Sequence, residues 1–316
     1  MMTEAEIASA FAEGVACHHQ GQIEKALLLY RKLLLLLPDS AGLLALMGVG
    51  QGQMGHGHEG LSWLMRSLRV NPSHAASYCN FGNLLKEKGD LLFALIAYQK
   101  SLTLDPGFFE PWMNLGNLLL EEENHEGRVA LYLQRAITLA PEAPLARSVH
   151  AGAYLIWGEN DRAQRISESA LCLSPECVEA WINRGVALKE LDEAKRALES
   201  HDRANRLSPR NIESRVNAAV ALNEMREFES ALDRLQGALA LFPDNAKAHL
   251  NLGIVSSALH RFDQALDAYD RALLLMAKDQ TGGDSASWKR KSAEVRVVKG
   301  FALSQMQLFD EALQQY

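Results

Sequence analysis

Residues 103–106 read Thr-Leu-Asp-Pro, and similar segments return as Thr-Leu-Ala-Pro at 138–141, Cys-Leu-Ser-Pro at 172–175 and Arg-Leu-Ser-Pro at 206–209. The proline recurs in steps of 34 residues, once 35, along most of the chain: Pro38, Pro72, Pro106, Pro141, Pro175, Pro209 and Pro243. Proline cannot continue a helix but is accepted near the start of one, so each site separates two helices. The spacing therefore predicts a tandem array of helical units.

The positions within each unit also repeat. When each proline is set at position 32, the units begin at residues 7, 41, 75, 109, 144, 178, 212 and 246. Position 8 is then small in every unit: Gly14, Gly48, Gly82, Gly116, Ala151, Gly185, Ala219 and Gly253. Position 20 is small in most units, and position 24 is often large, as in Tyr30, Tyr98 and Tyr269. Since only a small residue fits where two helix backbones approach closely, this pattern predicts a pair of packed helices in each unit.

These small and large residues at fixed offsets resemble the signature of the tetratricopeptide repeat. The resemblance implies an all-α fold, a right-handed α-solenoid (superhelix) of tandem helix-turn-helix units, with eight units over residues 7–279. The polar stretch 280–292 is interpreted as an insertion between repeats. A partial ninth unit is expected over 293–316, with Gly300 at position 8 and Ala312 at position 20.

The last unit would leave apolar residues without a neighbour, because each repeat of a solenoid buries its apolar side on the next. The residues concerned are Leu308, Phe309, Ala312, Leu313 and Tyr316. We expect either that the natural polypeptide continues beyond Tyr316 or that another molecule, such as a second copy, covers this edge.

Charge and composition argue against several classes of function. The chain has 32 Lys and Arg against 39 Asp and Glu, a formal net charge of −7, so it lacks the basic character that nucleic-acid binding requires. The acidic N-terminus does not resemble a signal peptide. The longest apolar stretch, 26–37, contains Arg31 and Lys32 and is too short to span a membrane. The four cysteines form no CxxC pair, and we expect a cytoplasmic protein.

No motif predicts catalysis, a cofactor or a metal site. Gly50, Gly52 and Gly55 match the GxGxxG pattern of nucleotide-binding loops, but no strand precedes them, so the pattern indicates a helix weakened by glycine. His56 and His58 would need further converging ligands to hold zinc, and we expect no metal. No Ser/His/Asp set has a recognisable spacing, so this segment is not predicted to be an enzyme.

The recurring asparagines are the strongest functional signal. Position 6 is Asn in five units, and position 9 adds two more: Asn80, Asn114, Asn183, Asn217 and Asn251, then Asn83 and Asn117. An amide offers donors and an acceptor, so a row of asparagines can hold the backbone of an extended peptide. The row resembles the asparagine ladder in the superhelical repeats of O-linked N-acetylglucosamine transferases. The alternative is that these asparagines cap or bridge neighbouring helices.

Three functional hypotheses follow. The leading one is a protein interaction scaffold that binds an extended polypeptide in a concave groove formed by the first helices. Because Glu110, Glu179 and Glu213 neighbour the asparagines, the groove is expected to prefer neutral or basic segments. The second hypothesis is the substrate-recognition part of a glycosyltransferase whose catalytic domain lies beyond residue 316. The third is self-assembly through the uncapped last unit.

Overall fold

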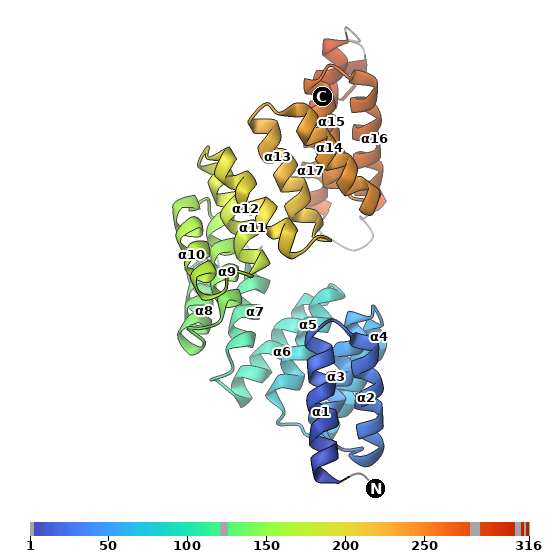
Figure 1. The fold of residues 1–316 in the computed structure, drawn as a ribbon, viewed down its shortest axis with the longest axis vertical. Helices are drawn as coiled ribbons and strands as arrows, with labels where there is room; N and C mark the ends of the chain where they lie inside the picture. Colours follow the sequence, from blue (N-terminus) through green and yellow to red (C-terminus); the bar gives the residue numbers. More distant parts are fainter. Residues whose placement is uncertain (1–2, 121–125, 279–284, 307–310, 313, 316) are drawn as a thin grey trace. The chain divides into compact units, whose positions relative to one another are not determined.

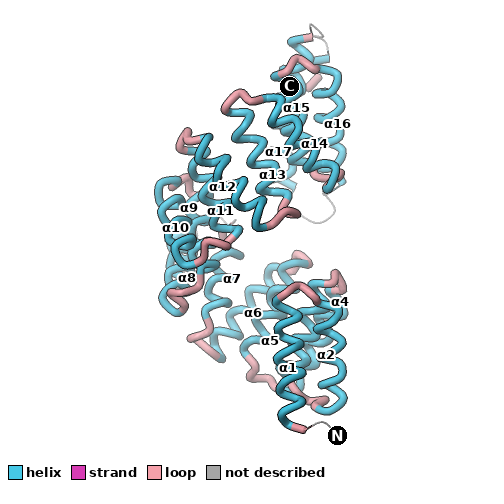
Figure 2. Tube along the Cα trace, in the orientation of Figure 1, coloured by secondary structure: helices cyan, strands magenta, loops and turns pink. Residues whose placement is uncertain are grey.

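The computed structural model describes residues 3–120, 126–278, 285–306, 311–312 and 314–315. Over these residues every regular element is a helix (Figures 1 and 2), so the predicted all-helical array is confirmed. The chain divides into two compact units, residues 1–141 and 142–316.

The first compact unit contains eight helices that pack as successive pairs, α1 with α2 through α7 with α8. We call the two members of each pair its first and second helix. Their bounds are α1 Glu4–His19, α2 Ile23–Leu36, α3 Ala41–Gln53, α4 Gly57–Val70, α5 Ala75–Glu87, α6 Leu91–Leu104, α7 Phe109–Leu119 and α8 Glu126–Leu139.

The second compact unit continues the same pairing, α9 with α10 through α15 with α16, and α17 packs on α16. The helices are α9 Pro144–Ile156, α10 Asn160–Leu173, α11 Val178–Glu190, α12 Ala194–Leu207, α13 Ile212–Glu224, α14 Phe228–Leu241, α15 Ala246–Ala258, α16 Phe262–Lys278 and α17 Ser285–Gln305.

The first helices from α3 to α15 begin at the residues where the sequence pattern places the unit starts. The first helix of the chain starts earlier, at Glu4, because Thr3 forms a capping box: its hydroxyl accepts from the Glu6 amide, and the Glu6 carboxylate accepts from the Thr3 amide. At the other end, α17 begins at Ser285, so much of the polar stretch 280–292 is helical. The edge residues Leu308, Phe309, Leu313 and Tyr316 lie outside the described residues.

In six of the eight helix pairs, a glycine at position 8 of the first helix lies against the residue at position 24 of the second helix. A Cβ atom added to Gly82 would lie 2.6 Å from the Tyr98 ring, and one added to Gly14 would lie 2.7 Å from the Tyr30 ring. Both tyrosines are fully buried. Each glycine therefore makes the space that the aromatic ring of the second helix fills.

The glycines of the GxGxxG segment have the same structural purpose. Gly50 and Gly52 lie within α3, where added Cβ atoms would collide with Leu27 and Leu84. Gly55 follows the helix with φ +83°, a left-handed conformation that suits glycine. These glycines thus permit close helix packing and a tight turn, which accounts for the pattern without a nucleotide.

One recurring contact was not predicted from the sequence. The side chain at position 4 of a first helix donates a hydrogen bond to the carbonyl oxygen of the proline six residues earlier. This bond holds the turn that precedes the helix. Trp112 Nε1 donates to Pro106 O at 3.0 Å, and Trp181 Nε1 donates to Pro175 O at 2.8 Å. Arg215 donates in the same way to Pro209.

The sixth repeat fills position 24 with a histidine. His201 is 1% exposed and packs over Gly185, and its Nδ1 has no hydrogen-bond partner among the described residues. Burial lowers the pKa of His201 to about 4; the charge of Lys247 acts in the same direction and that of Asp202 opposes it. His201 is therefore neutral in the folded protein at neutral pH.

We predict that Gly82→Ala destabilises the first compact unit by about 1–3 kcal/mol, because the added methyl group overpacks the Tyr98 contact. Gly237→Ala in α14 is the matched control, since nothing lies within 4 Å of its added Cβ. The control should stabilise its helix by about 0.5–1 kcal/mol. Urea unfolding followed by circular dichroism measures both effects, and a harmless Gly82→Ala would contradict the packing described.

We predict a loss of stability on acidification that depends on His201. Its pKa in the folded protein lies below the ordinary value of 6.5, so the unfolded chain takes up the proton first as the pH falls. The free energy of unfolding therefore keeps the full contribution of neutral His201 above about pH 6.5. It falls by up to about 3 kcal/mol as the pH approaches 4. His201→Leu, which copies Leu235 of the next repeat, should make the decline shallower in urea unfolding at a series of pH values. If His201→Leu loses stability with falling pH as steeply as the parent does, His201 is not the source of the loss.

Candidate functional site

The seven predicted asparagines all lie on first helices, at positions 6 and 9, and we call these positions the asparagine face. First helices contact one another within each compact unit, α3 with α5 and α5 with α7, then α11 with α13 and α13 with α15. Asn117 is exposed and the other six asparagines are half-buried. The structure thus brings the predicted residues onto neighbouring helices within each unit.

In the first compact unit, two residues of the asparagine face, Asn83 and Asn114, form a hydrogen-bond chain between repeats. Asn83 Oδ1 accepts from the Tyr98 hydroxyl at 2.8 Å and from Asn114 Nδ2 at 2.9 Å. Asn114 Nδ2 also lies 3.6 Å from Cys79 Sγ. Asn83 therefore joins the second helix of its own repeat to the first helix of the next.

In the second compact unit, Asn183 and Asn217 make contacts between repeats. Asn183 Nδ2 donates to the backbone carbonyl of Ser148 on α9 at 2.8 Å. Asn217 Oδ1 accepts from Lys247 Nζ on α15 at 2.9 Å. Asn251 instead donates to the Lys247 carbonyl within its own helix, at 2.8 Å.

Most of the asparagine face is thus already engaged inside the fold. Asn83, Asn114, Asn183 and Asn217 bridge helices, as the alternative interpretation of the sequence proposed. Asn80 and Asn117 make no side-chain hydrogen bond to any residue that the structure describes. The side-chain amides that remain fully available to a partner are therefore those of Asn80 on α5 and Asn117 on α7. The other asparagines keep only the donors and acceptors that their internal hydrogen bonds do not use.

The charges beside the asparagine face are mixed in the second compact unit. Burial lowers the pKa of Lys247, with Lys189 adding to the effect and Glu213 opposing it. Burial raises the pKa of Glu224, and the neighbouring acids Glu190 and Asp192 raise it further, while Lys189 opposes them. The face here carries the cations Lys189 and Lys247 among the acids Glu190, Asp192, Glu213 and Glu224.

Glu110 and Cys79 lie near each other on α7 and α5, beside the asparagine face. Burial raises the pKa of Glu110, whose Oε2 has no hydrogen-bond partner among the described residues. Burial, followed by the charge of Glu110, raises the pKa of the Cys79 thiol to about 12, so the thiol stays protonated at neutral pH. Cys79 is therefore poorly suited to act as a nucleophile.

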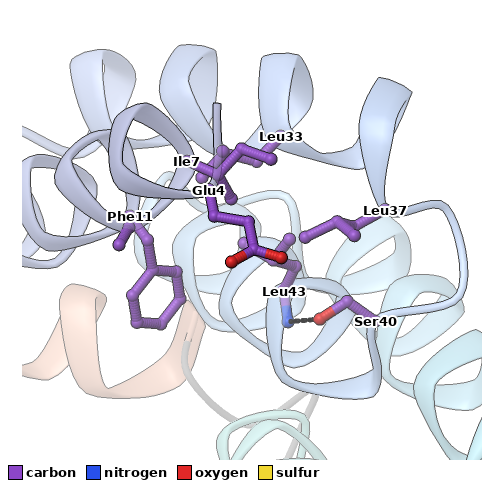
Figure 3. A pocket seen from close by; sticks show the side chains of 8 residues that line it. Glu4, Ile7, Phe11, Leu33, Leu37, Ser40 and Leu43 are labelled. Carbon is purple, nitrogen blue, oxygen red and sulfur yellow. Dashed lines mark hydrogen bonds between the residues drawn. The ribbon is translucent and has the colours of Figure 1, made fainter. Parts of the chain in front are cut away.

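Two hollows lie away from the asparagine face. Figure 3 shows the first, about 360 Å³, between α1, α2 and α3, where the side chains of Ile7, Phe11, Leu33 and Leu43 form an apolar lining beside the Glu4 carboxylate. The second, about 560 Å³, lies between α10, α11 and α12 and is lined by Trp181 and several charged side chains. Neither gathers a set of groups that indicates a reaction.

The described residues offer neither a metal site nor a membrane-spanning helix. No group of three or more His, Cys, Asp or Glu side chains in the described parts of the chain is placed to hold a metal ion. None of the described helices has both the length and the apolar character needed to cross a bilayer. All four cysteines are free; Cys172 is exposed and the others are buried.

Two stretches of the chain, residues 75–108 and 222–281, match sequence profiles of the family described as tetratricopeptide repeat. A comparison with curated proteins found no match.

Two solved structures share the fold. A chain of the APC/C hetero-tetramer Cut9-Hcn1 is 16% identical with a TM-score of 0.63, and the alignment covers 98% of this chain but 65% of that one. A tetratricopeptide repeat protein from Parabacteroides merdae is 15% identical with a TM-score of 0.59, covering 81% of this chain and 98% of that one. At these identities the likeness concerns the fold alone.

We predict that Asn183→Ala lowers the stability of the second compact unit by about 1 kcal/mol, since it removes the bond to Ser148. The matched control is Asn117→Ala, which loses no internal bond and gains helix propensity, so its stability should be equal or higher by about 0.5 kcal/mol. Urea unfolding compares the two. Equal stability of both variants and the parent would show that the Asn183 bridge contributes nothing.

Proposed function

We propose that this chain, two stretches of which match the tetratricopeptide repeat family, is a protein interaction scaffold that holds an extended segment of a partner along the asparagine face. The observation that carries this proposal is the pair of unengaged amides, Asn80 on α5 and Asn117 on α7. The two helices are in contact, so both amides can reach one bound segment. Asn114 lies on the same face and retains its own side-chain oxygen for a donor.

An extended peptide exposes a backbone N–H and C=O at every residue, and an amide side chain can pair with both. Such pairing gives affinity without reading the partner's sequence, and specificity then depends on neighbouring groups. Glu110 lies one helical turn before Asn114 on α7 and is partly exposed. We therefore expect bound segments to be neutral or basic.

The scaffold is preferred to the two other hypotheses. The APC/C hetero-tetramer, in which a chain of similar fold assembles with other subunits, supports a role in protein assembly. The substrate-recognition part of a glycosyltransferase would use the same face, but that hypothesis is supported only by the repeated position of the asparagines in the sequence. Self-assembly through the last unit depends on an edge that lies largely outside the described residues.

The proposal is tested by selecting displayed random peptides on the immobilised chain and measuring the affinity of the selected peptides. Asn80→Ala combined with Asn117→Ala should weaken binding about tenfold or more, because two hydrogen bonds are lost. The matched control is Gln99→Ala, which removes an exposed amide from the second helix α6. Thermal unfolding verifies that all variants remain folded.

Selected peptides that bind the double variant and the parent equally would contradict the asparagine face as the site. Failure to select any peptide would contradict extended-segment binding altogether. If only the Gln99→Ala control bound more weakly, the binding site would lie on the second helices.

A further inference from the structure

The second helices of the first compact unit carry a row of cations at one repeated position. Position 26 is basic in all four of them, counting one extra residue in the turn before α8: Lys32, Arg66, Lys100 and Arg135. All four side chains are exposed. Lys32, Lys100 and Arg135 form no ion pair with any residue that the structure describes, and Arg66 donates to the carbonyl of Pro38.

One helical turn earlier, at position 22, three of the same helices expose a large aliphatic side chain. Leu28 is 57% exposed, Ile96 51% and Leu131 66%. On α6 the apolar area is wider, because Leu92 and Phe93 are exposed by 68% and 61%. Exposed aliphatic residues that recur at one offset form a patterned surface, in contrast to scattered ones. We call positions 22 and 26 of α2, α4, α6 and α8 the basic–apolar face.

The other compact unit lacks this pattern at the equivalent places. Position 22 of its second helices is charged throughout: Arg165, Glu199, Asp233 and Asp267. Position 26 is basic in two of the four, Arg203 and Arg271, and Arg271 pairs with Asp244 at 2.6 Å. The basic–apolar face is therefore a property of residues 1–141 and does not follow from the repeat itself.

Acidic residues are confined to the ends of these helices. Helix α6 contains none, and Glu24, Glu59 and Glu126 lie in the first turns of α2, α4 and α8. Position 25, next to position 26, adds Arg31, and position 29, one helical turn further on, adds Arg69. A face with six cations and no acid at these four positions stands out in a chain of net charge −7.

From this arrangement we infer that the basic–apolar face is a second protein-binding surface, which takes an acidic segment of a partner protein that also bears aliphatic side chains. Carboxylates of the segment pair with Lys32, Lys100 and Arg135, and its aliphatic residues cover Leu28, Ile96 and Leu131. Because charge and apolar rows lie one helical turn apart, a segment with alternating acidic and aliphatic residues fits both.

An anionic membrane fits this surface less well. A helix that lies on a membrane offers a broad apolar stripe, but in α2 and α6 that stripe is already buried in the repeat, with Ala26, Tyr30, Ala94 and Tyr98 at its centre. At this surface the apolar side chains that remain exposed are Leu92, Phe93 and Ile96 on α6 and one side chain at position 22 on each of α2 and α8. They suffice to contact the side chains of a peptide.

The attraction is local. The chain as a whole repels an acidic partner, and charges further apart than about 8 Å are screened at physiological ionic strength. Binding must therefore depend on the few cations in direct contact and should weaken as salt is added.

The test uses a fluorescein-labelled synthetic peptide in which pairs of Glu alternate with pairs of Leu, titrated with the full chain and followed by fluorescence anisotropy. Two matched peptides replace Glu by Lys or Leu by Ser. The charge variant is Lys100→Glu with Arg135→Glu, and the apolar variant is Ile96→Ser with Leu131→Ser. Arg206→Glu, an exposed arginine of α12 in the other compact unit, is the control. Circular dichroism verifies folding.

We expect the Glu-Leu peptide to bind, both matched peptides to bind at least about tenfold more weakly, and both double variants to lose about tenfold or more in affinity. The Arg206→Glu control should bind as the parent does. No binding of the Glu-Leu peptide, or equal binding to the charge variant, overturns the inference. It is also overturned if the chain binds phosphatidylserine vesicles but no peptide, or if light scattering shows that the charge variant abolishes self-association while the peptide does not bind.

Discussion

The close approach of position 8 to position 24 is the contact on which the array depends. A glycine on the first helix makes room for a buried ring on the second, as Gly82 does for Tyr98 and Gly253 for Tyr269. This packing sets each helix pair, and the repeated pair then directs one set of positions to the asparagine face and another to the outer side of the second helices. In the seventh repeat, position 8 is Ala219 and position 24 is Leu235, which is smaller than tyrosine.

The same packing decides which polar groups remain for partners. Asn83, Asn114, Asn183 and Asn217 are used to join helices, so a regular row of asparagines is in large part structural. A hydrogen bond inside the fold must be broken before it can serve a ligand, whereas an unengaged amide such as Asn117 needs only to shed water. We therefore propose that the unengaged groups, and not the bridging ones, bind a partner.

Much of the fold could be predicted from the sequence because its signals are local and repeated. The proline spacing and the small residue at position 8 place the helices, and the asparagines fall on first helices as expected. Their partners could not be predicted, since the Asn183 bond to Ser148 depends on how adjacent repeats pack. The neutral state of His201 likewise arises from burial, and the helix beginning at Ser285 forms despite a polar sequence.

A double-mutant cycle on Gly253 and Tyr269 tests the central claim most directly. Tyr269→Leu copies Leu235 opposite Ala219, so Gly253→Ala should be tolerated better once the tyrosine has been replaced. The account predicts a coupling free energy of about 1 kcal/mol or more between the two substitutions, measured by urea unfolding. Additive effects of the two substitutions would show that this contact does not hold the helix pair together.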